Sequence, residues 1–538
     1  MDKFREAAGK DAVLQTLSRG VNTVTLDTGS REIVDLHAKM FAKHHTDVIR
    51  NFDALNDVKN LEYSGQRIKA HGAKHEIVIT MMDLPPKCKG AHDSAFYEKI
   101  LRDILESGIP FDSLCFKDAS GTSSPNKIYE TIKMARKLLG DKVHIRLHTH
   151  ETAGVSVAAY LAALEAGVDG IDLAASPVSG GTSQPDILTM LHAVKGTNYD
   201  LGGLETDKIL KYEDFLKECL KDYFIPPEAT MVSPLIPFSP MPGGALTANT
   251  QMMRDNKILD KFPSVIKAMQ EVVSKGGFGT SVTPVSQFYF QQAFNNVMFG
   301  DWKKIAEGYG KMVLGYFGKT PVEADKDIMK LASEQLGLKP TKEAAIDIAD
   351  KDEKKSLAFI KEELAKENIE ATDENIFILA ACGQKGMDYL KGNGQIKVRK
   401  LSQMNKAQIS PDATKFSIKV NGNNYNVEIA EGLDNFEIKS ISKANIKKPC
   451  KREESVKKEL PKTSDSNNFK ELKASMAGSV FKIKVKAGDK VIKGQVLVIL
   501  EAMKMEFPLE SNIDGVIKEI LINPNDTVED GQILIKFD

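Results

Sequence analysis

Cysteine is scarce in this sequence, with five cysteines among 538 residues and no C-x-x-C pair. Neither a disulfide framework nor a thiolate zinc site is indicated, and we expect a protein of the reducing cytoplasm. An excess of charge of one sign is also missing, because 73 basic residues face 74 acidic residues. The resulting net charge of −1 lacks the basic footprint of a nucleic-acid-binding protein, so we expect no nucleic-acid partner.

Long apolar runs are absent as well. Residues 1–15 contain no apolar stretch of signal-peptide length, and nowhere do about 18 apolar residues follow one another. We therefore expect an unexported chain without direct insertion into a membrane. Hydrophobic residues make up 42% of the sequence and charged residues 27%, which is typical of globular proteins. The length leaves room for roughly three or four domains.

Residues 1–195 repeat a unit made of a short apolar run, a polar loop and an amphipathic stretch. The runs lie at residues 12–20, 47–57, 76–82, 113–121, 144–151 and 170–181. Their spacing of about 26 to 37 residues is that of one strand, one helix and two loops, which predicts a parallel α/β architecture. A closed (β/α) barrel needs eight units, so the six runs predict either an open sheet or a barrel that lacks two units.

Polar residues gather at the C-terminal ends of these runs, where the active site of a (β/α) barrel lies. They are Arg19, Asp53, Lys117, His148 with His150, and Thr182. His148 and His150 stand at i and i+2 on a predicted strand, which projects both imidazoles to one face. Two nitrogen ligands are fewer than the three or more that a catalytic metal usually has in a protein.

Lys117 ends the preceding predicted strand. It is either a loop lysine paired with Asp118 or a third ligand, and a ligand must offer a lone pair rather than an ammonium charge. Carbamylation by CO2 would convert Lys117 into an anionic oxygen ligand.

Helical periodicity from residue 204 to 405 predicts a largely helical second domain. The candidate helices are EDFLKECLKDYF, DKFPSVIKAMQEVVSK, DWKKIAEGYGKMVLGYF, KDIMKLASEQLG and KSLAFIKEELAKEN. Residues 415–432 alternate apolar and polar side chains about N-G-N-N, which predicts a β-hairpin. The Lys, Glu, Ser and Pro of residues 440–468 predict a flexible linker.

Two C-terminal segments, 478–500 and 515–537, superpose with a constant offset of 37 residues. Their matching turn and core residues predict two copies of one β unit packed in quasi-symmetry. Between the copies, EAMKMEF places Lys504 between two methionines on a predicted turn. Lys504 is either an ordinary exposed turn lysine or a modified one, and the duplicated frame favours modification.

Several motifs together resemble the biotin-dependent carboxyltransferase family, which includes pyruvate carboxylase, the oxaloacetate decarboxylase α subunit and transcarboxylase. The C-terminal segment resembles a biotinyl domain, whose E-A-M-K-M signature is complete at residues 501–505. The barrel motifs are RNFDALND, FKDASG, LHTHETAG and SPVSGGTSQP. The helical part resembles the family's conserved second domain through MPGG, VTPVSQ and VLGYFGKTP.

The resemblance implies an α/β fold with an N-terminally incomplete (β/α)8 TIM barrel, a largely helical domain and an all-β biotinyl domain. We place the barrel at 1–235, the helical domain at 236–408, the hairpin segment at 409–439, the linker at 440–468 and the biotinyl domain at 469–538. The family's opening D-T-T-x-R-D-x-x-Q segment does not occur, so we expect the chain to begin near the third barrel unit, through a misplaced start or a truncation. Such a barrel would not close normally, and a metal would lose one anionic ligand.

The same resemblance implies the site residues. Biotin would be attached to Lys504, and a divalent metal, zinc or manganese, would be bound by His148, His150 and carbamylated Lys117. Thr182 would pass a proton between the substrate methyl group and the biotin ring, and Arg19 would pair with the substrate carboxylate. Asp53 would line the pocket or order the site, with an ordinary helix N-cap as the competing role.

The implied function is carboxyl transfer between biotin and pyruvate or oxaloacetate. No Gly-rich ATP-binding loop is visible, so we interpret the chain as the biotin-bearing carboxyltransferase subunit of a two-subunit pyruvate carboxylase, with a separate biotin carboxylase subunit as its partner. A biotin protein ligase and a homo-oligomeric assembly are further expected partners. Two alternatives stay open: the α subunit of a sodium-pumping oxaloacetate decarboxylase, and a catalytically inactive biotin carrier that lacks its first strands.

Overall fold

The computed structural model describes residues 1–394, 398–404, 414–420, 423–429, 471–474, 478–502, 505–524, 526–528 and 531–538. It divides into two compact units. The first is built mainly from Met1–Lys217 and Pro226–Gln395, and the second mainly from Ile396–Ala502 and Glu506–Asp538.

The first unit contains a six-stranded sheet whose strands follow one another in chain order and pair in parallel. The strands are β1 (Gln15–Ser18), β2 (Val48–Asn51), β3 (Lys74–Thr80), β4 (Ser113–Asp118), β5 (His144–Thr149) and β6 (Gly170–Ile171). Each strand overlaps one predicted run, so the six predicted strands are confirmed. In the described sheet β1 and β6 form the two edges, and the sheet is open between them.

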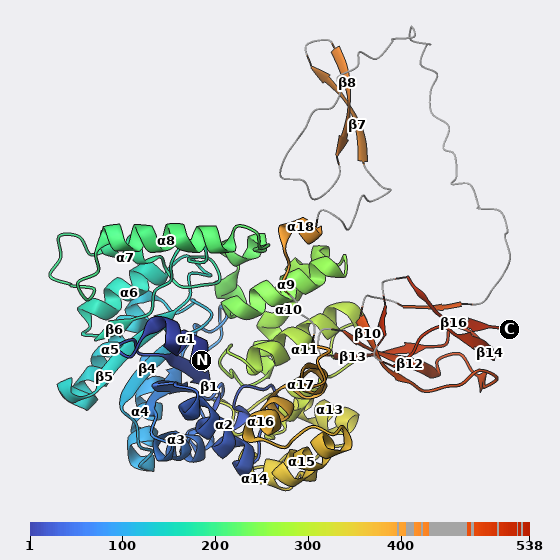
Figure 1. Cartoon of the computed structure of the whole chain (residues 1–538), viewed down its shortest axis with the longest axis horizontal. Helices are drawn as coiled ribbons and strands as arrows, with labels where there is room; N and C mark the ends of the chain where they lie inside the picture. The colour runs from blue at the N-terminus through green and yellow to red at the C-terminus, as the bar shows by residue number, and fades with distance from the viewer. Residues whose placement is uncertain are drawn as a thin grey trace. The chain divides into compact units, whose positions relative to one another are not determined.

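Helices alternate with these strands, as expected for a (β/α) barrel. They are α2 (Arg31–Lys43), α3 (Lys59–Ala70), α4 (Ser94–Ser107), α5 (Pro125–Leu139), α6 (Ser156–Glu165) and α7 (Ile187–Ala193), and a short α1 (Asp2–Ala8) precedes β1. Figure 1 shows α3, α4 and α5 beside the strands β2 to β5. Their apolar faces pack against the sheet in one continuous core.

The two faces of the sheet differ in character because side chains alternate along each strand. One face of β3, β4 and β5 joins the helical core through Ile77, Ile79, Leu114, Phe116, Ile145 and Leu147. The strand register places the intervening residues on the opposite face, including Glu76, Cys115, Lys117, Arg146 and His148. The predicted functional lysine and histidine therefore share the face that points away from the helices.

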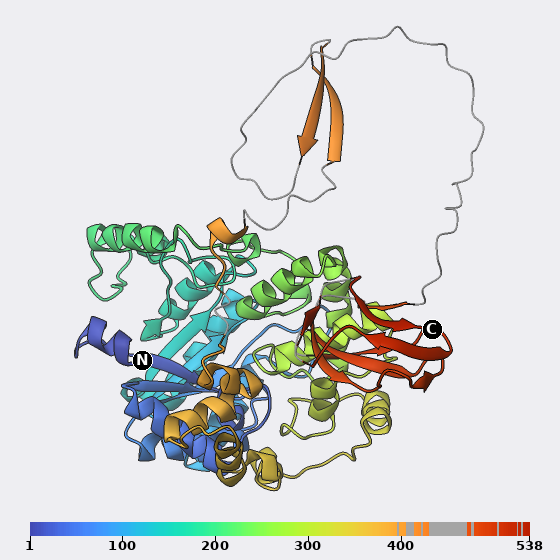
Figure 2. The same cartoon turned by 45° about the vertical axis from the view of Figure 1, so that its right-hand side comes forward.

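The helical part follows with ten α-helices in residues 206–390. They are α8 (Thr206–Leu220), α9 (Gly243–Asp255), α10 (Phe262–Lys275), α11 (Val285–Phe299), α12 (Glu307–Val313), α13 (Lys326–Leu336), α14 (Ala345–Asp350), α15 (Leu357–Lys366), α16 (Asp373–Cys382) and α17 (Gln384–Leu390). A short α18 (Leu401–Met404) comes later. Figure 1 and Figure 2 both show α14 to α16 beside α2, where Ile360, Leu364 and Ile376 pack on Ile33 and Leu36.

The predicted helices α10, α13 and α15 are confirmed, whereas two others differ in extent. The segment 301–317 forms only the short α12, because the chain turns at Gly300 and Trp302, whose φ angles are 98° and 57°. The helix predicted at 213–224 is α8, which begins seven residues earlier, at Thr206, and ends at Leu220. Helix α11 was not predicted, because most of its residues are buried and it therefore lacks the polar face of an amphipathic helix.

The C-terminal β domain has the predicted internal symmetry. Its strands are β9 (Glu471–Lys473), β10 (Gly478–Ile483), β11 (Lys490–Val491), β12 (Val496–Ala502), β13 (Met505–Glu510), β14 (Gly515–Ile520), β15 (Thr527–Val528) and β16 (Ile533–Phe537). They form two four-stranded sheets, β13-β12-β10-β15 and β9-β16-β14-β11, which correspond strand for strand. The strand pairs β10–β12 and β14–β16 are equivalent, and each shifts its register at the equivalent residue, Val480 in the first pair and Ile517 in the second.

The symmetry also fixes where the chain enters this domain. Strand β9 pairs with β16, so that the beginning of β9 lies beside the end of β16. In the other sheet β12 begins beside the end of β13, where the backbone N–H of Ser511 donates to the carbonyl oxygen of Gln495, so that Ala502 and Met505 lie at the far end of these two strands. Lys504 itself lies outside the described residues.

The predicted hairpin is confirmed as β7 (Thr414–Val420) and β8 (Asn423–Ile429), which pair antiparallel. The predicted linker 440–468 lies outside the described residues. Within the described ranges no helix is long and apolar enough to cross a membrane.

Candidate active site

His148 lies on β5, and His150 follows immediately after this strand. Their Nε2 atoms are 3.1 Å apart and their ring centroids 5.0 Å apart. The i, i+2 spacing has therefore brought the two imidazoles to the same face, as predicted.

The outer nitrogen of each imidazole is held by an oxygen. Nδ1 of His148 lies 2.8 Å from Oδ2 of Asp172, and Nδ1 of His150 lies 2.7 Å from the carbonyl oxygen of Thr182. A carboxylate and a carbonyl only accept hydrogen bonds, so both Nδ1 atoms carry the proton and both Nε2 atoms present a lone pair. Burial lowers the pKa of both histidines, that of His150 to about 3.

Lys117 lies opposite His148 in the register of β4 and β5. Its side chain is 6% exposed, and its Nζ sits 4.2 Å from the centre of the Phe52 ring. Burial, followed by the charge of Arg50, lowers the pKa of Lys117 to about 8. The amine is therefore far easier to deprotonate than an exposed lysine.

Asp118 does not pair with Lys117, so the alternative that Lys117 is a loop lysine paired with Asp118 is wrong. Asp118 points to its own loop, where its carboxylate accepts hydrogen bonds from the backbone N–H groups of Ser120, Gly121 and Ser123. Gly121 is required in that loop, since a Cβ there would lie 2.1 Å from the carbonyl oxygen of His150.

The donor atoms of the histidine pair fit a divalent cation. Two imidazole nitrogens that are each about 2.1 Å from one ion can approach each other to about 3 Å, close to the separation found between His148 and His150. Two lone pairs facing each other without a cation or proton would repel. In the described parts of the chain no cluster of three or more His, Cys, Asp and Glu side chains forms, so the pair supplies two ligands and not a complete set.

A network of charged side chains holds the Asp172 carboxylate, which binds Nδ1 of His148. The Arg50 guanidinium on β2 forms ion pairs with both Glu76 and Asp172, and Arg146 Nη1 lies 3.1 Å from Asp172 Oδ1. Burial alone would raise the pKa of the Asp172 carboxyl, but the hydrogen bond with His148 and the charge of Arg50 hold this pKa well below its usual range. Asp172 therefore stays ionised beside His148.

Sequence analysis missed Arg50 and Asp172. A signal existed for both residues, because Arg50 and Asp172 are each a charge inside one of the predicted apolar runs, at 47–57 and 170–181.

Arg19 lies directly after β1, next to the 3-10 helix η1 (Gly20–Asn22). Its Nη1 donates hydrogen bonds to the carbonyl oxygens of Val24, over 2.6 Å, and Thr25, over 3.2 Å. The charge of Arg19 contributes to the lowered pKa of Lys117, which places it at the same end of the sheet.

Thr182 joins the site through both its backbone and its hydroxyl group. Its carbonyl binds His150, and its Oγ1 lies 2.9 Å from Oγ1 of Thr247 on α9 and 3.0 Å from the carbonyl oxygen of Ala229. Gly243, at the start of α9, packs against the same carbonyl, and a Cβ at this position would lie 1.9 Å from the Thr182 oxygen. Through Gly243 of the MPGG motif and through Thr247, helix α9 therefore contacts Thr182 beside the histidine pair.

Asp53 is buried, but its carboxylate serves its own loop. Oδ2 accepts hydrogen bonds from the backbone N–H groups of Leu55 and Asp57, and Oδ1 accepts one from Asn60 Nδ2. Burial, followed by the charge of Asp57, raises the pKa of Asp53 to about 7. The structure therefore brings Lys117, His148, His150 and Thr182 together, whereas the Asp53 carboxylate is directed to the loop after β2.

Three family models match successive parts of the chain. The HMGL-like model matches residues 39–213, the conserved carboxylase domain matches residues 236–435, and the biotin-requiring enzyme model matches residues 470–537. The last match covers the symmetric β domain, so the chain carries a biotin-requiring domain.

Two relatives match this chain over most of their own length. A pyruvate carboxylase subunit of Methanocaldococcus jannaschii is 30% identical over 496 residues, which cover 91% of this chain and 81% of that protein. The methylmalonyl-CoA carboxyltransferase 5S subunit of Propionibacterium freudenreichii is 32% identical and covers 68% of this chain and 70% of that protein.

A solved structure supports the fold. The carboxyl transferase domain of Rhizobium etli pyruvate carboxylase superposes with a TM-score of 0.64 at 24% identity, covering 72% of this chain and 65% of that structure. The identities, the coverage and the order of the three matched domains lead to one conclusion: this chain belongs to the biotin-dependent carboxyltransferase family that includes the pyruvate carboxylase subunit of Methanocaldococcus jannaschii.

Proposed function

We propose that this chain transfers a carboxyl group between biotin and pyruvate or oxaloacetate, as the biotin-bearing carboxyltransferase subunit of a two-subunit pyruvate carboxylase. The observation that carries the proposal is the histidine pair, with Nε2 of His148 and of His150 3.1 Å apart and Lys117 opposite His148 in the strand register. An arrangement with two lone pairs facing each other is suited to hold a cation.

His148 and His150 would bind a divalent metal, zinc or manganese, and Lys117 would supply a third ligand after carbamylation. Its lowered pKa makes this reaction accessible, since only the neutral amine attacks CO2. A bound metal would act as a Lewis acid that polarises the 2-oxo group of the substrate. Asp172 would keep His148 in the tautomer that offers Nε2, as carboxylates commonly do for metal-bound histidines.

Two further residues would act on the substrate. Arg19 would pair with the substrate carboxylate, for which it keeps donors beyond the single nitrogen that binds the loop carbonyls. The Thr182 hydroxyl would hold a proton at Oγ1, and its neighbour Thr247 lies within hydrogen-bond distance of this atom. Asp53 would order the loop after β2 rather than contact the substrate.

Biotin would be attached to Lys504 by a biotin protein ligase and would carry the carboxyl group. A separate biotin carboxylase subunit would supply the activated group in the cytoplasm, and the chain would form a homo-oligomer. The domain division would be a barrel at 1–235, a helical domain at 236–408, a hairpin segment at 409–439, a linker at 440–468 and a biotinyl domain at 469–538, close to the three family matches.

Two alternatives are less well supported. Decarboxylation of oxaloacetate as part of a sodium pump would use the same residues, but the two relatives described above are a carboxylase subunit and a carboxyltransferase subunit. An inert carrier would have no need for a buried lysine opposite a paired histidine, so the retained geometry speaks against it.

The test combines the purified chain with a biotin carboxylase chain, ATP, bicarbonate and pyruvate, and measures oxaloacetate. We expect oxaloacetate formation, its loss in His148→Ala, and its retention in His144→Ala at the exposed start of the same strand. Avidin blotting of Lys504→Ala should show no biotin. Full activity of His148→Ala, or persistent biotin in Lys504→Ala, would refute the corresponding part of the proposal.

A further inference from the structure

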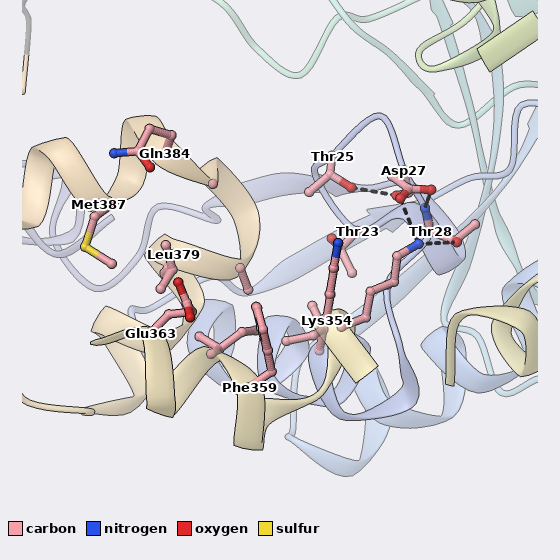
Figure 3. A pocket seen from close by; sticks show the side chains of 16 residues that line it. Thr23, Thr25, Asp27, Thr28, Lys354, Phe359, Glu363, Leu379, Gln384 and Met387 are labelled. Atoms are coloured by element: carbon pink, nitrogen blue, oxygen red, sulfur yellow. Dashed lines mark hydrogen bonds and ion pairs between the residues drawn. The ribbon is translucent and has the colours of Figure 1, made fainter. Parts of the chain in front are cut away.

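A cavity separate from the histidine pair lies in the first unit, between the loop after β1 and helices α15 to α17. Its volume is about 370 Å³, which is within the usual range for small-molecule sites. Its lining residues come from the segment 23–33 on one side and from the segments 354–363 and 379–387 on the other (Figure 3). None of these residues belongs to the active site described above.

Hydrogen bonds between the two walls hold the cavity in shape. Ser30 Oγ donates to the carbonyl oxygen of Lys355 over 2.6 Å, and the backbone N–H of Leu357 donates to Glu32 over 2.8 Å. A cavity built in this way has a small ordering cost when a ligand enters.

The chemistry of the lining is divided between an apolar floor and a polar rim. Ile360, Leu379 and Met387 contribute to the floor. Asp27 and Glu363 are the acidic residues of the lining. Asp27 pairs with Lys355 over 2.7 Å, and Glu363 pairs over 2.7 Å with Lys366, which also pairs with Glu362 over 3.1 Å.

Lys354 is the remaining charge. It lies in the 3-10 helix η6 (Glu353–Lys355), is exposed, and has no ion-pair partner among the residues whose positions are described. In Figure 3 its side chain points from η6 toward the loop that carries Thr23. A cation at the mouth of an apolar cavity is suited to an organic anion. The Thr25 hydroxyl does not contribute to such a site, because it donates to the backbone carbonyl oxygens of its own loop.

The loop wall of the cavity is strained. Thr23 is β-branched, 1% exposed and has a φ of 52°, a conformation that costs free energy and is kept where the surroundings or a function require it. The same loop contains Val24 and Thr25, whose carbonyl oxygens hold the Arg19 guanidinium. A ligand that contacts Thr25 would thus touch a residue whose carbonyl oxygen accepts a hydrogen bond from Arg19.

We propose that this cavity binds a small amphipathic carboxylate, with its apolar body on the Ile360, Leu379 and Met387 floor and its carboxylate on the Lys354 ammonium, against the loop that carries Thr23. The bound ligand holds the loop 23–29 in place and thereby positions Arg19. The effect on Arg19 as a substrate-binding residue rests on the proposed function, whereas the binding itself does not.

The binding test uses 3-phenylpropionate as the probe and its neutral amide as the matched ligand, measured by calorimetry on the full chain. We expect the carboxylate to bind at least about tenfold more tightly than the amide, since a charged hydrogen bond is lost in the amide. Lys354→Gln should abolish this difference, and Lys361→Gln, an exposed lysine of α15 outside the cavity, should leave it unchanged. Ala380→Leu, which narrows the cavity, should weaken both ligands.

No binding of the probe at about 10 mM would overturn the proposal, as would equal binding to the wild type and to Lys354→Gln. Hydrogen exchange then tests the link to Arg19. The amides of Thr25 and Gly29, which bond to Asn22 and Val21, should exchange more slowly with the probe bound. Unchanged exchange in this loop would refute the link even if the probe binds, and neither readout depends on carboxyl transfer.

Discussion

The Asp172 carboxylate and the His148 imidazole form a hydrogen bond of 2.8 Å between Oδ2 and Nδ1, on the side of the ring that faces away from His150. Asp172 directly follows β6 and is in turn held by Arg50 on β2 and by Arg146 on β5, the strand of His148 itself. The orientation of His148 is therefore set by three strands of the sheet and not by its own strand alone.

Replacing Asp172 with Asn should weaken metal binding about 10- to 100-fold, because the amide can leave His148 in the wrong tautomer. Chelator competition followed by elemental analysis measures this affinity. Asp169→Asn is the matched control, since Asp169 pairs with Arg136 and contacts neither histidine. Unaltered affinity in Asp172→Asn would show that the hydrogen bond does not orient a metal ligand.

Gly243→Ala should disrupt the junction between α9 and the barrel site. The added Cβ would lie 1.9 Å from the Thr182 carbonyl oxygen and 2.8 Å from Nδ1 of His150, so one of these groups must move. We expect a loss of about 1–3 kcal/mol in the free energy of unfolding and a large loss of activity. Gly244→Ala, which has open space around the new Cβ, should be nearly neutral in both measurements.

Carbamylation of Lys117 should depend on pH. Burial lowers the pKa of this lysine to about 8, so in the metal-free chain the amine is mostly protonated below pH 8 and mostly neutral above it. The carbamate signal from ¹³C-labelled bicarbonate should therefore grow as the pH rises from 7 to 9, measured by NMR. Lys117→Gln should lack the signal. A signal that persists in this variant would assign the carbamate elsewhere.

Arg50→Leu should destabilise the barrel part strongly. Arg50 is buried and pairs with Glu76 and Asp172, and removing it takes a partner from the buried Glu76 carboxylate and from the partly buried Asp172 carboxylate. Such losses typically cost about 3–5 kcal/mol, which denaturant unfolding would detect. Arg102→Leu, at an exposed pair with Glu98 on α4, should change stability little. Similar stabilities of the two variants would contradict the importance of the network.

The six strands and the histidine pair could be predicted from sequence because they depend on local periodicity. Alternation along β5 is enough to place His148 and His150 on one face. The internal repeat of the C-terminal domain was visible for the same reason, since Val480 and Ile517 occupy equivalent core positions in two similar segments.

The missed features depend on contacts between distant segments. Helix α11 is buried on most sides, so its sequence has no polar stripe to identify it. The partnership of Asp172 with Arg50 joins residues 122 positions apart, and no local pattern encodes it. The role of Asp53 was ambiguous for the opposite reason, because an acid after a strand can serve a ligand or its own loop equally well.

The two-fold symmetry of the C-terminal domain has a mechanical consequence. Glu471, at the start of β9, lies beside the end of β16, whereas Ala502 and Met505 lie at the far end of β12 and β13. Under the proposed function, biotin would be attached between these two residues and would therefore be remote from residue 471. A strand of six residues such as β13 is about 20 Å long, so the two ends of the C-terminal β domain are separated by about this distance. In a biotin carrier, this fixed length would extend the radius that the prosthetic group can reach without lengthening the linker.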